Sequence, residues 1–306
     1  MKKSILYILV VVILSACGDT EATRQRLDRQ QRLEQQRQDS LALKIAVLPT
    51  LDGLPLFLAH EHRMFDTLGV DVRLRRYNAQ MDCDTAFRGT TVEGIVSDLV
   101  RTERFQQQGK GLKYVAGTVQ HWQLIASKRS RVSRLDQLGD KVVGITRFSG
   151  TDWLTNQCLE GVKVKGDVYR VQINDVLIRL RMLIGNEIDA AWLSEPWATL
   201  ARQRGGVVLV DSSDRYPVLG VIAFKDEAIR DKRRQKQLSL FLKGYNMACD
   251  SLNAHGISAY ADVLKKYYRI DDKTIAALPK IRYIHAVEPT ADNIKNVSAF
   301  VKTTIN

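Results

Sequence analysis

Short apolar runs alternate with helix-like segments through most of the chain, and this alternation limits the possible fold more than any other feature. The first run, 44–48, reads as a strand, and a helical pattern follows over 56–65. Strand-like and helix-like segments then alternate from 70 to 210, and Gly69 and Gly185 stand just past two of the predicted helices. Glycine often ends a helix because it adopts left-handed backbone angles without strain. Repeated strand–helix units predict an α/β fold.

The strand–helix pattern runs through two series, which predicts two α/β lobes. We place 123–127 as the last strand of the first series, and a strand at 218–224 then points back toward that series. The chain is therefore expected to cross between the lobes twice. Ligands of such sheets bind in the crevice beyond the strand ends, which predicts a ligand cleft between the lobes. The predicted division is a first lobe of 43–128 plus 220–306 and a second lobe of 129–219.

The N-terminus has the three parts of a bacterial lipoprotein signal, in order. Lys2 and Lys3 are positive, Ile5–Leu14 is apolar, and Leu14-Ser15-Ala16-Cys17 places small residues before a cysteine. The apolar run is shorter than the roughly 20 residues of a spanning helix. We therefore predict a signal peptide over 1–16, lipid on Cys17 and a polar tether over 17–42. The alternative is an ordinary signal peptide with a chance cysteine.

The charge of the chain does not predict nucleic-acid binding. Lys and Arg exceed Asp and Glu by 46 to 34, a net charge of +12. Such a balance raises the possibility of nucleic-acid or membrane-surface binding. The basic residues are spread along the chain, however, and no nucleic-acid-binding motif accompanies them. We expect no nucleic-acid partner.

The remaining cysteines and the histidines predict neither a disulfide framework nor a metal site. Cys83, Cys158 and Cys249 are odd in number and have no paired spacing, so at most one pair could form. The alternative is that all three are buried thiols. His60 and His62 lie two positions apart on a predicted helix and so face different sides. We expect no metal and no cofactor.

Polar residues follow several predicted strands, where they would face a cleft. The turn Ser149-Gly150-Thr151 opens a helix, whose unpaired N–H groups attract an anionic or polar group. The alternative is that Ser149 or Thr151 only caps this helix. His121 follows another strand and either lines the pocket or belongs to a plain turn.

The stretch Ile188–Trp197 carries two tryptophans and a carboxylate beside a strand end. Trp192 and Trp197 fit either a buried core or a pocket wall, because tryptophan is largely buried in both. Glu195 precedes Pro196, a residue favoured in the first turn of a helix. Its carboxylate either supports that helix start or faces the cleft.

Four motifs in the same order resemble periplasmic substrate-binding proteins of the nitrate, sulfonate, taurine and thiamine-precursor group. They are Lys44–Pro49 followed by Leu54–Val72, the Val132–Ile145 entry to the second lobe, and Glu187–Trp197 with its Glu-Pro pair. The resemblance covers roughly 44–250. The usual Lys-Gly-Leu-Phe is replaced by His62-Arg63-Met64-Phe65, which removes the helix-ending glycine.

This resemblance implies a type II periplasmic-binding-protein fold, with two lobes that close on a ligand like a hinged trap. It implies a monomeric, lipid-anchored receptor in the cell envelope, facing the periplasm or the outside, that delivers a small molecule to an ABC permease and is not an enzyme. The ligand contacts that it implies are Thr50, Leu51, Asp52, Gly53, Ser97, Gln120, His121, Ser149, Gly150, Thr151, Trp192 and Glu195, with Tyr216 added near the return crossing.

Two other functions and several ligands stay open. The chain could be a sensor or scaffold lipoprotein that binds a partner protein, or a relative of enzymes that synthesise the thiamine pyrimidine. Nearby aromatic residues together with Asp52 and Glu195 favour a pyrimidine with a ring amine. The Ser149 turn favours a sulfonate or carboxylate, and a phosphorylated pyrimidine would suit both.

Overall fold

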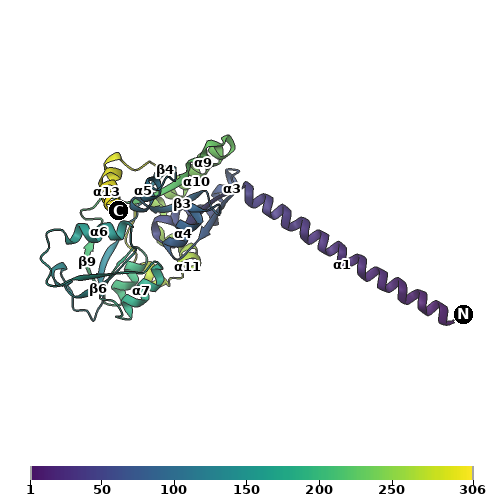
Figure 1. Ribbon diagram of the computed structural model, residues 1–306, viewed down its shortest axis with the longest axis horizontal. Helices are drawn as coiled ribbons and strands as arrows, with labels where there is room; N and C mark the ends of the chain where they lie inside the picture. Colours follow the sequence, from purple (N-terminus) through teal and green to yellow (C-terminus); the bar gives the residue numbers. More distant parts are fainter. Residues whose placement is uncertain (1, 305–306) are drawn as a thin grey trace. The chain divides into compact units, whose positions relative to one another are not determined.

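Two five-stranded sheets form the framework of the chain after Ala42, and each belongs to one lobe (Figure 1). The computed structural model describes the backbone of residues 2–304 and the side chains of residue 21 and residues 23–303. The chain divides into two units between Ala42 and Leu43. The first unit holds one helix, α1 (Lys2–Leu41). The side chains of the predicted signal peptide and of Cys17, the predicted site of lipid attachment, lie outside the described side chains.

The first sheet has the order β2-β1-β3-β10-β4. β1 is parallel to β2 and β3, whereas β10 runs antiparallel between β3 and β4. β1, β3 and most of β10 are buried, because helices cover both faces of the sheet. The strands of this first lobe are β1 (Leu43–Val47), β2 (Val72–Arg76), β3 (Gly94–Asp98), β4 (Leu112–Gly117) and β10 (Gly220–Lys225).

The second sheet has the order β7-β6-β8-β5-β9 and repeats the arrangement of the first. β6 is parallel to β7 and β8, and β5 runs antiparallel between β8 and β9. Each sheet thus contains one antiparallel strand that follows a crossing from the other lobe. The strands of this second lobe are β5 (Gln123–Ala126), β6 (Lys141–Ile145), β7 (Val168–Gln172), β8 (Ala190–Leu193) and β9 (Val207–Asp211).

The helices of the two lobes are unequal in number within the described chain. The C-terminal segment returns to the first lobe, where α10 packs on α2 and α13 packs on α5. The helices of the first lobe are η1 (Leu51–Gly53), α2 (Leu54–Glu61), α3 (Met64–Thr67), α4 (Gln80–Arg88), α5 (Leu99–Gln107), α9 (Asp226–Arg230), α10 (Lys232–His255), η3 (Ile257–Tyr260), α11 (Ala261–Tyr268), α12 (Asp272–Ala276) and α13 (Ala291–Thr304). Those of the second are η2 (Leu135–Gln137), α6 (Gly150–Leu159), α7 (Val176–Ile184) and α8 (Trp197–Gln203).

Two sequence predictions were wrong. Residues 123–127 were assigned to the first lobe, but β5 pairs with β8 and β9 of the second, so the first crossing precedes β5. The segment 56–65 was expected to form one helix. It breaks at Arg63, whose φ of 53° is left-handed and separates α2 from α3. Arg63 therefore adopts the conformation that a glycine would take more easily.

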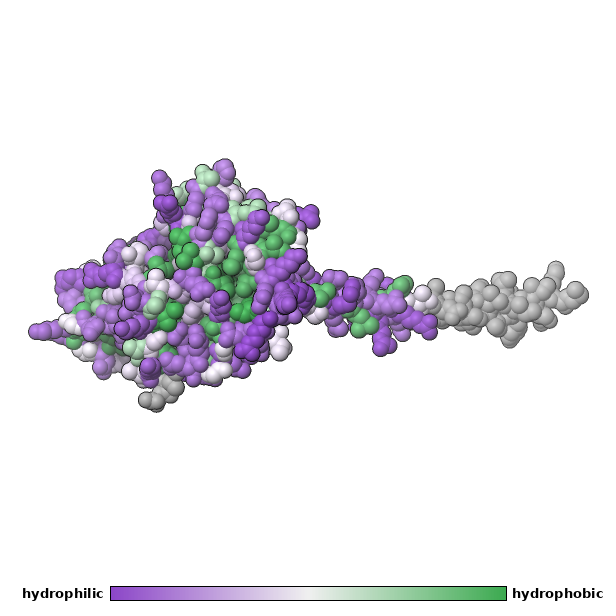
Figure 2. Space-filling model, turned by 90° about the horizontal axis from the view of Figure 1, so that it is seen from above, coloured by the Kyte–Doolittle hydropathy of each residue, from purple (hydrophilic) through white to green (hydrophobic). Residues whose placement is uncertain are grey.

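The face of the second unit seen in Figure 2 is mostly polar. Figure 2 shows charged and polar residues over most of one face, with hydrophobic residues in small patches. Cys83, Cys158 and Cys249 are buried and unpaired, and burial raises the pKa of each thiol to about 12. Among the described residues, none of the helices combines the length and apolar character that crossing a bilayer requires.

Candidate functional site

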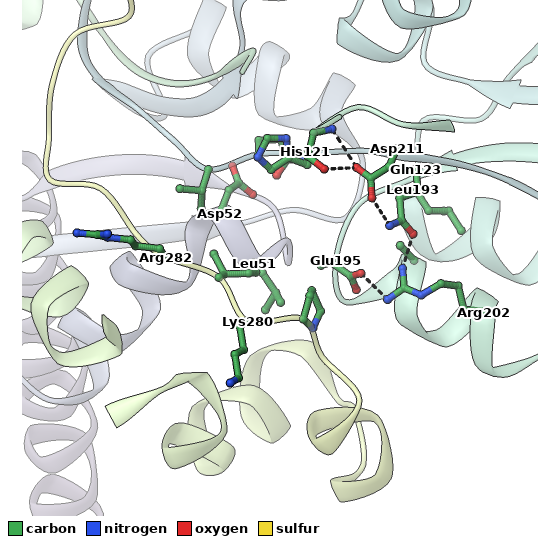
Figure 3. Close-up of a pocket in the computed structure, with 16 residues that line it drawn as sticks. Leu51, Asp52, His121, Gln123, Leu193, Glu195, Arg202, Asp211, Lys280 and Arg282 are labelled. Carbon is green, nitrogen blue, oxygen red and sulfur yellow. Dashed lines mark hydrogen bonds and ion pairs between the residues drawn. The ribbon is translucent and has the colours of Figure 1, made fainter. Parts of the chain in front are cut away.

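A cavity of about 330 Å³ lies between the two lobes, at the ends of their strands. The first lobe contributes Leu51 and Asp52, and the first crossing contributes residues 119–121. The second lobe contributes Glu195 and Arg202, which Figure 3 shows joined by an ion pair. We call this space the interlobe cavity. Groups from both lobes line it, so one small ligand bound there would contact both lobes.

Asp52 is a buried carboxyl group in the wall of the interlobe cavity. It lies in η1, just after β1, and is only 5 % exposed. Thr118 Oγ1 donates to its Oδ2 at 3.2 Å. With its amide nitrogen oriented toward Asp52, Gln120 also donates to Oδ1 at 2.5 Å. Burial raises the pKa of Asp52, although bonds from Thr50 and Thr118 counteract part of that rise.

Glu195 both supports a helix and lines the interlobe cavity, so the two interpretations of this residue coexist. Its Oε2 accepts hydrogen bonds from the backbone N–H of Thr199 at 3.0 Å and from Thr199 Oγ1 at 2.6 Å. Its Oε1 lies 2.8 Å from Nη2 of Arg202. The carboxylate is therefore fixed at the start of α8, with its charge partly balanced by Arg202.

His121 and Asp211 complete the polar wall. His121 is half-buried, and desolvation lowers the pKa of its imidazole, with a smaller opposing effect from Asp211. The ring is therefore neutral at pH 7 and can donate one hydrogen bond and accept another. Asp211 accepts hydrogen bonds from Gln123 Nε2 at 2.5 Å and from Ser213 Oγ at 2.6 Å.

The apolar part of the interlobe cavity is aliphatic. No Trp, Tyr or Phe is among its lining residues; the apolar ones are Leu51, Val119, Leu193, Ala198, Pro279 and Ile281. Trp192 is fully buried in the core, where its Nε1 donates to Thr155 Oγ1 at 2.8 Å. The sequence favoured a pyrimidine ligand because aromatic residues were expected around it. The lining of this cavity provides no such aromatic surface.

Five predicted contacts gather at the interlobe cavity, whereas eight lie elsewhere. Leu51, Asp52, Gln120, His121 and Glu195 line it. The others are part of the surrounding structure: Thr50, whose carbonyl accepts from Tyr268; Gly53 in η1; Ser97 beside Gln80; Ser149, Gly150 and Thr151 at the start of α6; Trp192 in the core; and Tyr216 edge-on to Trp153.

The helix start at Ser149 already holds a carboxylate. Ser149 caps α6 through Thr151 N, and the N–H of Gly150 donates to Asp98 Oδ1 at 2.9 Å. Asp98 belongs to the first lobe, where the same oxygen also caps α5 through Arg101 N. The place where the sequence predicted an anionic ligand is thus filled by a side chain from the opposite lobe. Burial raises the pKa of Asp98 to about 7.

Sequence reasoning missed several residues of the interlobe cavity. Arg202 lies two helical turns after Glu195, a spacing that could have identified it, and Asp211 is the polar last residue of β9. Residues 279–282 come from an irregular C-terminal segment with no periodic pattern. Nothing in their sequence points to the cavity.

Comparison with solved structures identifies the fold. A ligand-binding component of an ABC-type import system from Staphylococcus aureus, with zinc bound, has a TM-score of 0.70 and 16 % identity, over 86 % of this chain and 92 % of that one. The alkanesulfonate-binding protein of Xanthomonas axonopodis pv. citri bound to MOPS gives 0.72 and 14 %, over 86 % and 92 %. The nitrate-binding protein of Synechocystis PCC 6803 gives 0.70 and 11 %, over 86 % and 85 %.

These similarities show that the chain has the periplasmic-binding-protein fold, with two α/β lobes joined by two crossings, as its sequence predicts. The sequence matches no protein-family model. It also matches no curated protein.

Proposed function

We propose that the chain is a solute-binding protein that captures a small organic molecule between its lobes and delivers it to an ABC importer. One observation carries this proposal: Asp52 of the first lobe and Glu195 of the second line the same cavity. Its volume of about 330 Å³ suits a small solute. The fold shared with importer components and with sulfonate- and nitrate-binding proteins supports the same function.

The polar groups of the interlobe cavity favour a solute that carries an amine. Three carboxyl groups line it, those of Asp52, Glu195 and Asp211, while Arg202 is already paired with Glu195. Lys280 and Arg282 stand at its edge, and their side chains extend away from Asp52 and Glu195 in Figure 3. An ammonium group would find acceptors from both lobes. Because the apolar lining is aliphatic, we place an aliphatic amine, such as an amino acid or aminosulfonate, ahead of a pyrimidine.

The proposed setting is the cell envelope. Cys17 would carry the lipid, residues 17–42 would act as a spacer, and the two lobes would work as a monomer on the periplasmic or outer face. The described side chains from Thr23 to Ser40 are almost all exposed, as a spacer requires. The partner would be an ABC permease, and no catalytic step is proposed.

A thermal-shift screen of the purified protein tests this function. Amino acids, aminosulfonates, amine-free sulfonates, pyrimidines and nitrate would each be added. A ligand at about one hundred times its Kd stabilises the folded state by about 2.7 kcal/mol, which raises the melting temperature by several degrees. We expect the shift with amine-bearing solutes. No shift with any class would overturn the proposal and favour a scaffold lipoprotein that binds a partner protein.

Replacing Glu195 with glutamine is expected to weaken binding of the amine-bearing solute by about 10- to 100-fold, because a hydrogen bond to a charged group contributes about 1.5–3 kcal/mol. Calorimetric titration measures this change. The melting temperature should fall by less than the loss of affinity would suggest, since glutamine retains an oxygen that can accept from Thr199 even though its amide no longer pairs with Arg202. Glu187→Gln, on the exposed surface of the same lobe, is the matched control and should bind normally. A melting temperature that falls in proportion to the affinity would mean that Glu195 acts only on α8.

A further inference from the structure

A second cavity, of about 250 Å³, is lined by four arginines from both lobes. Arg88, Arg101 and Arg104 come from α4 and α5 of the first lobe, and Arg147 precedes α6 in the second. Asp84 is the one carboxylate in the lining, and Arg101 forms an ion pair with it. We call this space the arginine cavity. It shares no lining residue with the interlobe cavity.

The arginine cavity has an excess of positive charge that the described side chains leave unbalanced. Its four arginines outnumber its one aspartate by three charges, and no ion pair of Arg88, Arg104 or Arg147 exists among residues 21 and 23–303. The charge of Arg88 acts on Arg104 and the charge of Arg104 acts on the buried Arg101, and burial strengthens such repulsion. A bound anion would remove most of this cost.

Two buried guanidinium nitrogens in this cluster lack hydrogen-bond partners. They are Nε of Arg101 and Nη1 of Arg104. Arg101 is only 7 % exposed, so water does not easily substitute for the missing partner. Burial is the main reason why the pKa of Arg101 is lowered to about 10, and burial followed by the charge of Arg88 lowers that of Arg104. Both groups nevertheless stay cationic at neutral pH.

Aromatic rings hold the guanidinium groups in place. Cζ of Arg104 lies 3.8 Å from the ring centroid of Phe148, across the boundary between the lobes. Cζ of Arg147 lies 5.3 Å from the same centroid, and Cζ of Arg88 lies 5.0 Å from that of Phe105. A guanidinium that stacks on a ring keeps its edge available, and that edge matches two oxygens of a phosphate group.

We propose that the arginine cavity binds a phosphate-type dianion through Arg88 and Arg104 of the first lobe and Arg147 of the second. Two negative charges suit the unbalanced charge better than one, and contacts from both lobes would stabilise the closed arrangement. Inorganic phosphate and the phosphoryl group of a small phosphomonoester share this chemistry. The inference is independent of the proposed solute in the interlobe cavity.

The test is calorimetric titration of the full-length protein with inorganic phosphate, in chloride buffer of constant ionic strength. Wild type should bind phosphate saturably. Arg147→Gln should weaken binding by about tenfold or more, because it removes one charge-assisted contact. Arg147→Lys, which keeps the charge but loses the two-pronged geometry, should be intermediate. Arg147 is exposed, so these variants should fold normally.

Arg282→Gln is the matched control, because Arg282 is an exposed arginine at the edge of the interlobe cavity. It should bind phosphate like wild type. The proposal is overturned if wild type shows no saturable binding, if Arg147→Gln binds equally well, or if Arg282→Gln loses the affinity instead. Titration with glycerol phosphate separates the two sources: tighter binding than inorganic phosphate indicates an organic phosphate, and weaker binding indicates the free ion.

Discussion

Replacing Trp192 with alanine is expected to lower the free energy of unfolding by about 3–5 kcal/mol, the usual cost of removing a large aromatic side chain from a core. Trp192 is fully buried in β8, and its indole N–H is bonded to Thr155. The substitution leaves a cavity and an unpaired hydroxyl group. Chemical denaturation followed by circular dichroism measures the loss.

Thr155→Val is the companion variant for Trp192. It keeps the volume of the side chain but leaves the indole N–H without its partner, at a cost of about 1–3 kcal/mol. Binding of the amine-bearing solute should change little in either variant wherever the protein remains folded. A stable Trp192→Ala protein that loses solute affinity would instead place this tryptophan in the pocket wall.

The free energy of unfolding should fall as the pH rises from about 4 to about 7, because Asp98 titrates in this range. Its pKa is about 7 in the folded protein and, like that of an ordinary aspartate, about 3.9 in the unfolded chain. Between these values the folded state holds the extra proton, so rising pH favours unfolding. One pKa unit corresponds to about 1.4 kcal/mol, so the full effect above pH 7 reaches at most about 4 kcal/mol.

Asp98→Asn isolates this effect. The amide oxygen can still accept from Arg101 N and Gly150 N, both of which bond to the same oxygen of Asp98. The variant should match wild type near pH 4 and exceed it in stability at pH 8, as measured by denaturation at a series of pH values. If the two proteins differ in stability by the same amount at every pH, or if the variant is less stable than wild type at pH 8, the assignment of this pKa to Asp98 is contradicted.

The order of strands and helices could be predicted because it rests on local patterns. α7 ends at Ile184, directly before Gly185, the glycine that the sequence places just past a predicted helix. The lobe of β5 could not be predicted, because Gln123–Ala126 is a short apolar run that would suit either sheet. Its partners, β8 and β9, lie far along the chain, and local propensity carries no information about them.

The candidate site was predictable in part from polar residues that follow strands. That rule found His121 and Glu195, and the family resemblance added Leu51, Asp52 and Gln120; all five line the interlobe cavity. The same rule also selected the turn at Gly150, whose amide is bonded to a carboxylate 52 positions away. Whether a helix start meets a ligand or a side chain depends on how the lobes close, and a sequence pattern does not record that closure.

The antiparallel strand inserted in each sheet has a consequence for the synthesis of the protein. In the first sheet β10 lies between β3 and β4, so β4 has no strand neighbour until residues 220–225 have left the ribosome. The sheet of the first lobe therefore stays incomplete, with unpaired strand edges at β3 and β4, while the whole second lobe is translated. The second lobe is continuous in sequence, whereas the first lobe could not be excised as one piece, because β10 follows the whole second lobe. A chaperone that shields the unpaired edges of β3 and β4 during this delay would protect the chain from aggregation.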